Sequence, residues 1–530
     1  MNLSETCARY LKAAGIGTVF GYPGDPSVGF LEACRTEGID FVLARREGTA
    51  GLMAEAAGML TGRPGVCLST LGPGSTNLVN AVANAWLDRV PMLAISGQID
   101  TARAPTFTHQ VVDQRAIFGP VSKWAAEVAP STVGHVLRKA HRIAVAPRPG
   151  PVHLTMHADH VTAEAEDDTV APPPVDVVTG TIVALSDAAA EARLKAARRP
   201  VVLFGVSAMQ AGAGAAVAAF AEHVGAAIVA APMAKGTVDE AHPRFAGTLD
   251  MACQAVMWDF LRSADLVVCV GFDAVELIKP WSVAVPVIHV DVVPNTDQIY
   301  AAEIEIVGPI GPLLEALADA VPQAPGWPEA EIAAHRDALQ AAFDSGRVAG
   351  ALNPSDVIRV ARDVLPGDAI AATDVGSHKL LVGQGWRPAG PRRFLMTNGL
   401  SSMGFALPAA IAAKHLCPEV PVICFTGDGG LAMVQSELRL AASLKLGLKV
   451  LVFVDNSLNR IELKQMARQV PSTGTVIEET RLGPLAESMG CHAVMAEDET
   501  TLADALAADP GDVPLVIGAR IDPAQYAAQF

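Results

Sequence analysis

The chain around Asp428 constrains the fold more than any other stretch. An apolar run, Val420–Phe425, ends at the glycine-rich turn Gly427–Gly430. A helical pattern, Leu431–Leu446, follows it and leads into a second apolar run, Lys449–Val454. Strand, turn, helix and strand in this order form the βαβ unit of a parallel sheet, whose buried strands are short runs rich in Val, Ile and Phe.

A carboxylate follows each of these two apolar runs, Asp428 after the first and Asp455 after the second. Ligands of open α/β sheets bind outside the carboxyl ends of the strands, so both side chains are expected at one edge. Two oxygen ligands beside glycine amides at a helix N-terminus describe a site for Mg²⁺ carrying a diphosphate. Taken alone, the pair is also typical of strand-end aspartates that cap helices, and an isolated Gly-Asp-Gly favours that simpler interpretation.

Composition excludes several classes of protein. A chain of 530 residues predicts several domains, and a net charge of −17 argues against nucleic acid as a partner. The eight cysteines show no Cys-x-x-Cys pair, which favours a reducing compartment, and the N-terminus has no signal peptide, so the cytoplasm is expected. The most apolar stretch is interrupted by Glu222 and His223, which argues against a membrane span.

Strands alternate with helices along most of the chain, which predicts α/β architecture with doubly wound parallel sheets. Three domains are expected, at residues 1–165, 180–321 and 350–530. The segments between them, 163–178 and 321–331, are acidic or proline-rich and are interpreted as linkers. The middle domain lacks an ordered Gly-x-Gly-x-x-Gly after a strand, so a structural role is predicted for it.

Four further polar clusters come at or after predicted strand ends: Glu47, the turn at 72–77, the loop at 108–110 and the segment 373–378. Three of them have an ordinary alternative. Taken alone, Glu47 is more typical of a helix cap or dipole partner, the turn at 72–77 is equally suited to a simple turn with a helix start, and the loop at 108–110 need not be functional. Considered together, the clusters supply the parts of one phosphate-binding cradle, and this makes the simpler alternatives less attractive.

Together these motifs resemble the thiamine-diphosphate-dependent superfamily of decarboxylases and acetohydroxyacid synthases, in particular acetolactate synthases. The Gly-Asp-Gly-Gly turn followed by Asp455–Asn456 is similar to the diphosphate and metal motif of that superfamily. Residues 45–78 resemble its pyrimidine-binding domain, 108–124 resemble catabolic acetolactate synthases, and 397–410 resemble the loop that holds the folded cofactor. The resemblance covers nearly the whole chain and implies pyrimidine-binding, middle and diphosphate-binding domains in that order.

The resemblance implies two cofactors, thiamine diphosphate and Mg²⁺. The metal would be held by Asp428, by the side chain of Asp455 and by a main-chain carbonyl near Ser457, with Asn456 as the competing ligand. Met403 would hold the cofactor in its bent shape. Further cofactor contacts are implied for Pro23, Gly24, Thr70, Gly72, Asn77, Gly376, Ser377, His378, Leu400, Gly427, Gly429 and Gly430.

The same resemblance implies a reaction. Glu47 would hydrogen-bond the pyrimidine and activate the cofactor, which would decarboxylate a 2-oxo acid such as pyruvate. Gln110, together with His109, would orient a second carbonyl for carboligation. Active sites of this family form between subunits, so a homodimer or homotetramer is expected.

Two departures from the family pattern bear on cofactor and substrate. The arginine-containing stretch of flavin-dependent relatives is replaced here by VGFDAVELIKPW, so FAD is not expected. Lys464 stands where biosynthetic synthases carry a tryptophan, which favours a carboxylated or sulfonated acceptor unless Lys464 is merely a solvated helix charge. The alternatives are a decarboxylase or lyase without carboligation, an acyl-transferring relative and a catalytically inactive binding partner.

Overall fold

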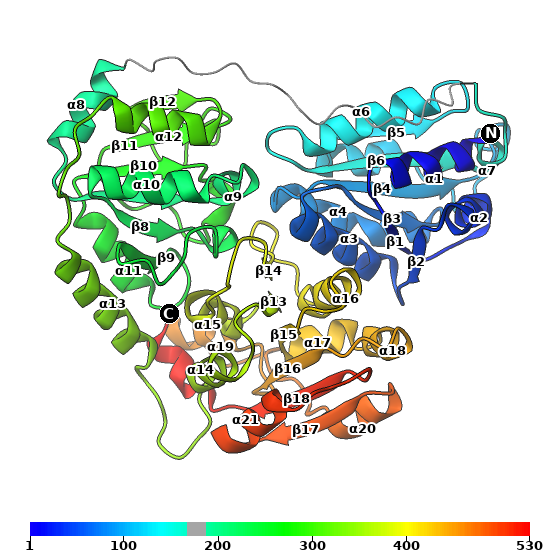
Figure 1. Cartoon of the computed structure of the whole chain (residues 1–530). Helices are drawn as coiled ribbons and strands as arrows, with labels where there is room; N and C mark the ends of the chain where they lie inside the picture. The colour runs from blue at the N-terminus through cyan, green and yellow to red at the C-terminus, as the bar shows by residue number, and fades with distance from the viewer. Residues whose placement is uncertain (167–186) are drawn as a thin grey trace. The chain divides into compact units, whose positions relative to one another are not determined.

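The computed structural model describes residues 1–166 and 187–530, which contain three six-stranded sheets flanked by helices (Figure 1). Every pairing between neighbouring strands is parallel. The predicted α/β architecture with three doubly wound sheets is therefore confirmed. Most of the first predicted linker, 163–178, lies outside the described residues.

The chain divides into two compact units. The first contains the described residues of Met1–Val177 together with Leu400–Pro418 and Val434–Leu446, and the second contains the remaining described residues. The first sheet therefore lies in one unit, and the second and third sheets lie in the other.

The first sheet has the strand order β2-β1-β3-β4-β6-β5. Its strands are β1 (Thr18–Gly21), β2 (Asp40–Leu43), β3 (Gly65–Ser69), β4 (Met92–Gln98), β5 (Trp124–Val128) and β6 (Pro151–His157). The helices of this segment are α1 (Leu3–Ala13), α2 (Val28–Glu37), α3 (Glu47–Thr61), α4 (Pro73–Leu87), α5 (Gln114–Phe118), α6 (Val133–Val145) and α7 (Ala158–Val161). Two later helices, α16 (Ala406–Leu416) and α18 (Glu437–Ser443), belong to the same unit, and α16 packs on α3.

The middle sheet has the order β12-β11-β10-β7-β8-β9, which corresponds to the arrangement of dinucleotide-binding folds. Its strands are β7 (Pro200–Phe204), β8 (Ala227–Ala230), β9 (Phe245–Thr248), β10 (Leu266–Val270), β11 (Val287–Asp291) and β12 (Ile304–Val307). Its helices are α8 (Ala188–Ala196), α9 (Val206–Gln210), α10 (Gly214–Val224), α11 (Gln254–Arg262), α12 (Ile310–Asp319) and α13 (Glu329–Phe343). None of the helices among the described residues is long and apolar enough to span a membrane.

The third sheet has the order β14-β13-β15-β16-β18-β17 and so repeats the connectivity of the first. Its strands are β13 (Ile370–Thr373), β14 (Phe394–Met396), β15 (Val422–Gly427), β16 (Lys449–Val454), β17 (His492–Ala496) and β18 (Leu515–Arg520). Its helices are α14 (Pro354–Val364), α15 (Ser377–Gly385), α17 (Asp428–Val434), α19 (Asn459–Ala467), α20 (Leu482–Ser488) and α21 (Glu499–Ala507). The shared order fits the duplication that similar first and last domains suggest.

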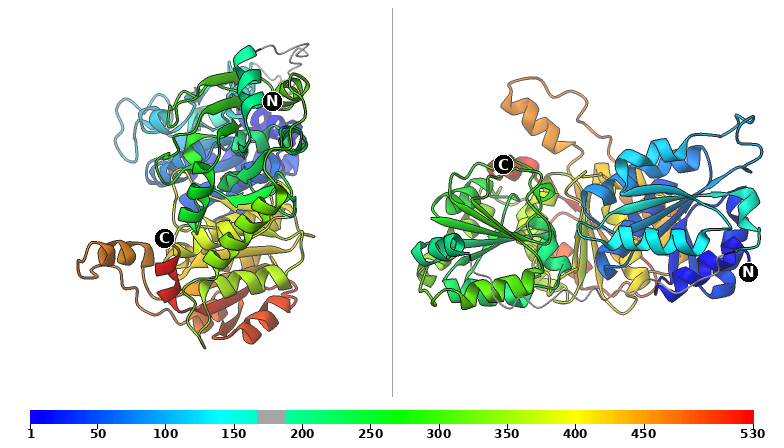
Figure 2. Two further views of the ribbon diagram at one scale, coloured as in Figure 1. Left: turned by 90° about the vertical axis from the view of Figure 1, so that its left-hand side faces the viewer. Right: turned by 90° about the horizontal axis from the view of Figure 1, so that it is seen from above.

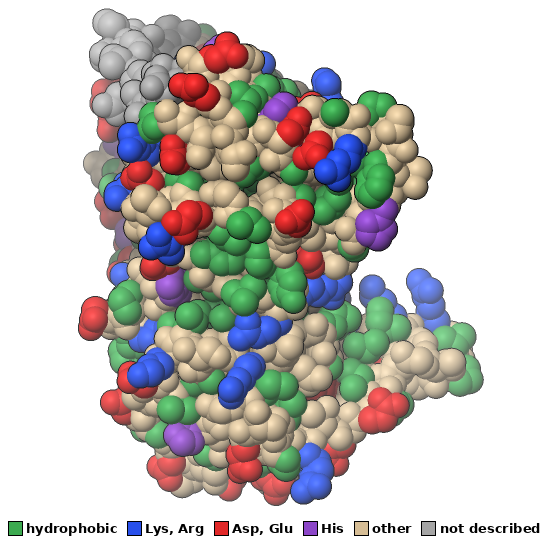
Figure 3. Space-filling view, turned by 90° about the vertical axis from the view of Figure 1, so that its right-hand side faces the viewer, with side chains coloured by type: hydrophobic (Ala, Val, Ile, Leu, Met, Phe, Trp, Pro, Cys, Tyr) green, Lys and Arg blue, Asp and Glu red, His purple; other side chains and the backbone are tan. Residues whose placement is uncertain are grey.

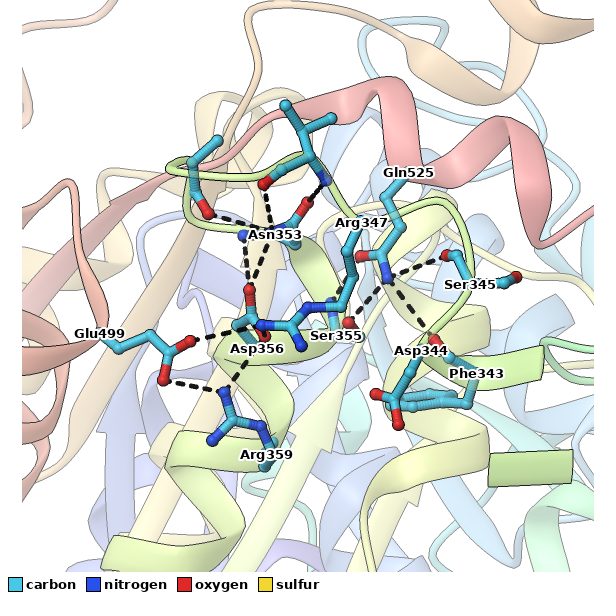
Figure 4. A network of polar contacts seen from close by, with 12 residues as sticks. Phe343, Asp344, Ser345, Arg347, Asn353, Ser355, Asp356, Arg359, Glu499 and Gln525 are labelled. Atoms are coloured by element: carbon cyan, nitrogen blue, oxygen red, sulfur yellow. Dashed lines mark hydrogen bonds and ion pairs between the residues drawn. The ribbon is translucent and has the colours of Figure 1, made fainter. Parts of the chain in front are cut away.

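A polar network fixes the start of α14 to the C-terminal turn (Figure 4). The buried carboxylate of Asp356 caps α14 together with Asn353 and pairs with Arg347 at 2.6 Å and Arg359 at 3.1 Å. Gln525 accepts a hydrogen bond from the backbone N–H of Ser355 and donates one to its hydroxyl. The turn that carries Gln525 is thereby held against the start of α14, because buried polar groups that lose their hydrogen-bond partners are costly.

One segment of the second unit stands away from its sheet. Figure 2 shows α19 and the chain that follows it, coloured orange, projecting from the rest of the third sheet, and Figure 3 shows hydrophobic and basic side chains side by side on the projection. Its exposed apolar side chains are Ile461, Met466, Val470 and Val476.

Several predicted boundaries were wrong. The turn at 72–77 is the start of α4, because Pro73 at the first helical position favours helix. Asp428 is the first residue of α17 rather than part of a turn, and the single helix predicted for Leu431–Leu446 is two helices, α17 and α18.

Candidate functional site

Asp428 and Asp455 lie at the ends of neighbouring strands, β15 and β16, which pair in register at Gly427 and Phe453. The Oδ2 atom of Asp428 accepts hydrogen bonds from the backbone N–H of Asn456 at 2.7 Å and of Asp455 at 3.2 Å. Its Oδ1 atom accepts one from Gly429 at 2.7 Å. The structure therefore brings the predicted metal-binding residues to one edge of the third sheet.

The two carboxylates repel one another. Burial and then the negative charge of Asp428 raise the pKa of Asp455 to about 7. A cation between them would remove this penalty. The described residues contain no group of three or more His, Cys, Asp or Glu side chains placed to hold a metal. The two carboxylates at the ends of β15 and β16 fit a hard ion such as Mg²⁺, which takes one or two carboxylates and completes its shell with phosphate and water oxygens.

Asn456 adopts a left-handed backbone conformation, with φ of 55°. Its carbonyl accepts a hydrogen bond from Ile477 at 2.8 Å. Ser457 is held by a hydrogen bond from its N–H to Asp455 Oδ1 at 3.2 Å and by its hydroxyl, which donates to Glu462. These contacts fix the turn after β16 and direct it back toward Asp455.

The predicted diphosphate segment 373–378 begins at the end of β13, the strand next to β15, and runs into the start of α15. His378 hydrogen-bonds through Nε2 to Asp374 Oδ1 at 3.0 Å and stacks on Phe453, with ring centroids 5.2 Å apart. The hydroxyl of Ser377 donates to Asn459 Oδ1 at 2.7 Å, so it is engaged within the protein. A Cβ at Gly376 would lie 2.7 Å from the His378 ring, which explains the glycine.

Asp374 is a buried carboxylate that the sequence reasoning missed. Besides His378 it accepts a hydrogen bond from the hydroxyl of Thr426 at 3.3 Å. A Cβ at Gly430 would overlap its Oδ2 atom. The signal was present, because Asp374 follows β13 directly, as Asp428 and Asp455 follow β15 and β16.

A second cluster forms in the first unit, at the ends of β1, β2 and β3, which are neighbours in the sheet. Glu47 is the first residue of α3, and its Oε2 atom accepts a hydrogen bond from Asn77 Nδ2 at 3.1 Å. The loop after β1 packs on Thr70, because a Cβ at Gly24 would overlap the Thr70 hydroxyl. The structure thus brings Glu47, Asn77, Thr70 and the Pro23–Gly24 loop together.

The residues predicted for the second carbonyl lie in an exposed loop. Gln110 adopts a left-handed backbone with φ of 60° and packs against Gly72, where a Cβ would lie 2.7 Å from Gln110 Cβ. His109 is exposed, and its ring contacts Phe107 with centroids 6.3 Å apart. Gln110 therefore lies beside the end of β3, whereas no contact joins His109 to Glu47.

The loop before α16 carries Leu400 and Met403. Its backbone turns through left-handed conformations at Ser401, with φ of 59°, and Gly404, with φ of 78°. The N–H of Ser402 donates to Asn84 Oδ1 at 3.3 Å, which ties this loop to α4. Leu400 is exposed and Met403 is half-buried, so neither side chain is fully packed in the core of its unit.

Comparison with known families places each cluster in a segment that matches a TPP binding domain. Residues 1–117 match the N-terminal TPP binding domain of thiamine pyrophosphate enzymes, residues 187–317 match the central domain and residues 374–518 match the C-terminal TPP binding domain. This chain belongs to the thiamine pyrophosphate enzymes. The Glu47 cluster lies in the first matched domain and the Asp428 cluster in the last, so the resemblance predicted from the motifs is confirmed.

Curated thiamine pyrophosphate enzymes match almost the full length of the chain. The catabolic acetolactate synthase of Raoultella terrigena is 29% identical over 540 residues, covering 98% of this chain and 95% of the relative. A probable 2-ketoarginine decarboxylase of Pseudomonas aeruginosa is 30% identical, covering 94% and 90%. The large subunit of acetolactate synthase isozyme 1 of Escherichia coli is 31% identical, covering 87% and 83%.

The middle domain carries a further buried carboxylate. Glu276 accepts hydrogen bonds through Oε2 from the backbone N–H groups of Val206 at 2.9 Å and Asp273 at 3.2 Å. Val206 is the first residue of α9, directly after β7, where a phosphate commonly binds in this strand order. The Glu276 carboxylate therefore engages the N–H of Val206 at the start of this helix.

Proposed function

We propose that this enzyme uses thiamine diphosphate and Mg²⁺ to decarboxylate a 2-oxo acid, with pyruvate as the first candidate, and joins the product to a second carbonyl compound. The observation that carries the proposal is the pairing of Asp428 and Asp455 at the ends of β15 and β16. Asp428 binds the turn that carries Asp455, and the charge repulsion between the two carboxylates favours a divalent cation. Asp455 follows β16 directly, as Asp428 follows β15, which supports its side chain over that of Asn456 as the ligand.

The protein's own residues would then do the following. Asp428, Asp455 and the backbone at Ser457 would hold the metal, and His378, whose ring is fixed by its hydrogen bond to Asp374, would contact the diphosphate. The bound thiamine diphosphate supplies the electron sink for loss of carbon dioxide. Glu47 exchanges a proton with the pyrimidine, and Asn77 keeps its carboxylate in place.

The two clusters belong to separate units, and we propose that each active site combines the Glu47 cluster of one subunit with the Asp428 cluster of its partner. Exposed apolar side chains next to both clusters support this arrangement. Tyr22 and Leu43 flank the Glu47 cluster and are 43% exposed, and Met433 in α17 is 56% exposed. Their burial between subunits favours a homodimer, or a tetramer built from dimers.

Basic side chains on α19 and just after it favour an acidic second substrate. Arg460, Lys464 and Arg468 follow one another at helical spacing and form a single stripe. Lys464 is exposed, so it is available to a substrate carboxylate or sulfonate. Gln110 is the candidate for orienting the acceptor carbonyl, and the contact of its loop with Gly72 holds it beside the end of β3.

Product analysis tests the proposal. Purified enzyme is incubated with thiamine diphosphate, Mg²⁺ and a panel of ¹³C-labelled 2-oxo acids, and carbon dioxide and products are followed by gas detection and NMR. Pyruvate is expected to give acetolactate, and omission of either cofactor is expected to abolish the reaction. Absence of carbon dioxide from every 2-oxo acid would overturn the proposal.

A decarboxylase without carboligation is the second candidate, favoured by the similarity to the 2-ketoarginine decarboxylase. Free aldehyde in the same NMR experiment would identify it, and an acyl phosphate would identify transfer to phosphate. The basic stripe on α19 argues against a cationic substrate, because like charges repel. A Lys464→Met variant is expected to raise KM for an acidic acceptor about two- to fivefold, the worth of an exposed ion pair, and to leave a neutral acceptor unchanged.

Two further proposals concern the absence of FAD and the cellular compartment. We propose that the enzyme works without FAD, because Glu276 engages the amides that a flavin diphosphate would need. All eight cysteines are free thiols, seven of them buried, which supports a reducing compartment such as the cytoplasm.

A further inference from the structure

A cavity lined by both apolar and charged side chains lies inside the second unit, between β9, α13 and the ends of α14 and α15. Its volume is about 80 Å³, and none of its lining residues belongs to the candidate active site. One wall is a single face of α13, because Arg336, Leu339, Gln340 and Phe343 are spaced at helical intervals. Its polar lining includes Glu240, Thr248, Arg336, Arg362, Gln384 and Arg387.

Positive charge exceeds negative charge around this cavity. Three guanidinium groups line it against one carboxylate, Glu240. That carboxylate is already paired with Lys235, whose Nζ lies 2.9 Å away and also donates to Thr248 at 3.1 Å. Lys235 is completely buried behind the cavity wall, so it adds a further positive charge that water does not screen.

The arginines have donors to spare. Arg336 makes a long hydrogen bond of 3.5 Å to the carbonyl of His242, and Arg362 lies 3.5 Å from the carboxylate of Asp363. Arg387 makes no hydrogen bond or ion pair with the described part of the chain. A guanidinium carries five N–H donors in a planar fork that matches carboxylate and phosphate oxygens. The three groups together therefore suit an oxyanion.

Gln384 indicates that a ligand of this cavity carries a hydrogen-bond donor. Its Oε1 atom is buried and has no hydrogen-bond partner among the described residues. A buried amide oxygen without a partner is unfavourable, and a ligand hydroxyl would satisfy it. Gln384 lies in the last turn of α15, whereas Ser377 and His378 lie in the first turn of the same helix. The cavity is thus separated from the diphosphate residues by roughly 10 Å of helix, at 1.5 Å per residue.

We propose that this cavity binds a small oxyanion that also carries a hydroxyl group, as hydrogen phosphate does. Its volume accommodates a few water-sized groups, since one water needs about 10–15 Å³ of such space. Phosphate monoesters and hydroxy acids share this chemistry, and a dianion with no hydroxyl satisfies only the arginines. The inference does not depend on the reaction proposed above.

Calorimetric titration with inorganic phosphate and with sulfate tests the inference. The enzyme is first saturated with thiamine diphosphate and Mg²⁺ at pH 8, so that the diphosphate site is filled. Phosphate is then a dianion with one hydroxyl, and sulfate is a dianion with none. Phosphate is expected to bind at one site per chain and more tightly than sulfate.

Three variants assign the site. An Arg336→Gln/Arg387→Gln double variant is expected to weaken phosphate at least tenfold, and Arg198→Gln, an exposed arginine of the same unit outside the cavity, is expected to have no effect. Gln384→Met is expected to weaken phosphate to the level of sulfate and to leave sulfate unchanged. No phosphate binding at millimolar concentration, or equal binding by the double variant, would overturn the inference. If thiamine diphosphate itself fails to bind, the reaction proposed above falls, and the comparison of these variants still decides the phosphate site.

Discussion

Asn77 donates a hydrogen bond from its Nδ2 atom to the Oε2 atom of Glu47 across 3.1 Å, joining the second turn of α4 to the first residue of α3. Gly74 makes room for this pair, because a Cβ there would lie 3.1 Å from Glu47 Oε1. The Glu47 carboxylate is therefore held by neighbours that fix its position.

A Glu47→Gln variant keeps the shape and the hydrogen bond from Asn77 but cannot exchange a proton. Turnover is expected to fall by about 10²–10⁴-fold, the usual contribution of a general acid–base group. Binding of thiamine diphosphate, followed by fluorescence quenching, is expected to change little. Glu32→Gln, at an exposed position on α2, is the control. Full turnover in the Glu47 variant would remove Glu47 from the catalytic role.

Mixing two inactive variants tests whether sites form between subunits. Glu47→Gln and Asp428→Asn each remove one half of the site. In a mixed dimer with shared sites, one site carries both substitutions and the other carries neither. Refolding an equal mixture is then expected to restore about a quarter of wild-type activity, since half of the dimers are mixed and each has one intact site. Sites built within one chain would restore none.

A Gly430→Ala variant tests the packing of Asp374, in the predicted diphosphate segment, against α17. The added Cβ would overlap Asp374 Oδ2 and lie 3.0 Å from the Thr426 hydroxyl. The free energy of unfolding is expected to fall by about 1–3 kcal/mol, as in overpacked cores. Gly483→Ala in α20 is the matched control, because nothing lies within 4 Å of its added Cβ, and about 0.4–1 kcal/mol of stabilisation is expected. Thermal unfolding measures both, and equal midpoints would refute the overlap.

Glu55 makes stability depend on pH. Burial and then the negative charge of Asp88 raise the pKa of Glu55 well above its usual value, and Asn84 Nδ2 donates to both Glu55 oxygens at 2.8 and 2.9 Å. The folded protein therefore keeps a proton that the unfolded chain releases above about pH 4.3. The contribution of Glu55 to the free energy of unfolding is fully present below that pH. Above it, this contribution declines by up to about 1.4 kcal/mol per pH unit until the pKa of Glu55 in the folded protein is reached.

A Glu55→Gln variant mimics the protonated acid and is expected to remove this decline. Its thermal midpoint should fall less than that of the wild-type enzyme between pH 5.5 and pH 8. Glu37→Gln on α2, whose carboxylate pairs with Arg9 at the surface, controls for a general loss of negative charge. Parallel pH profiles of the wild-type enzyme and the Glu55 variant would show that Glu55 is ionised in the fold.

Flavin binding is expected to be absent. The enzyme is incubated with excess FAD, desalted and examined by absorbance near 450 nm, where retained flavin absorbs. We expect no retained flavin, because the Glu276 carboxylate engages the N–H groups of Val206 and Asp273. Stoichiometric retention would contradict this assignment.

The sequence predicted those features that depend on local pattern. Asp428 and Asp455 were expected at neighbouring strand ends, and β15 and β16 pair directly. Short apolar runs ending in a polar residue are a strong signal for parallel strands, because both faces of such strands are buried. The same signal at Asp374 was overlooked, although it required no further information.

Other features depend on contacts distant in sequence. Glu437 lies in an apolar helical stretch, yet its buried carboxylate accepts hydrogen bonds from Thr49 at 2.6 Å and from the backbone of Arg45 at 2.9 Å. The strand β14 has three residues and pairs only with β13, so its own pattern is weak. The roles of such residues emerge only when the partner segments are placed in space.

The packing of α16 and α18 in the first unit has a consequence for synthesis on the ribosome. The helix α3 is buried from Thr49 to Gly58, and α16 supplies part of that cover. Because α16 begins at Ala406, 345 residues after α3 ends at Thr61, this part of the cover is missing for roughly 20–70 s after α3 emerges, at 5–20 residues per second. The nascent chain must therefore keep a nearly uncharged helix from aggregating for most of its own translation.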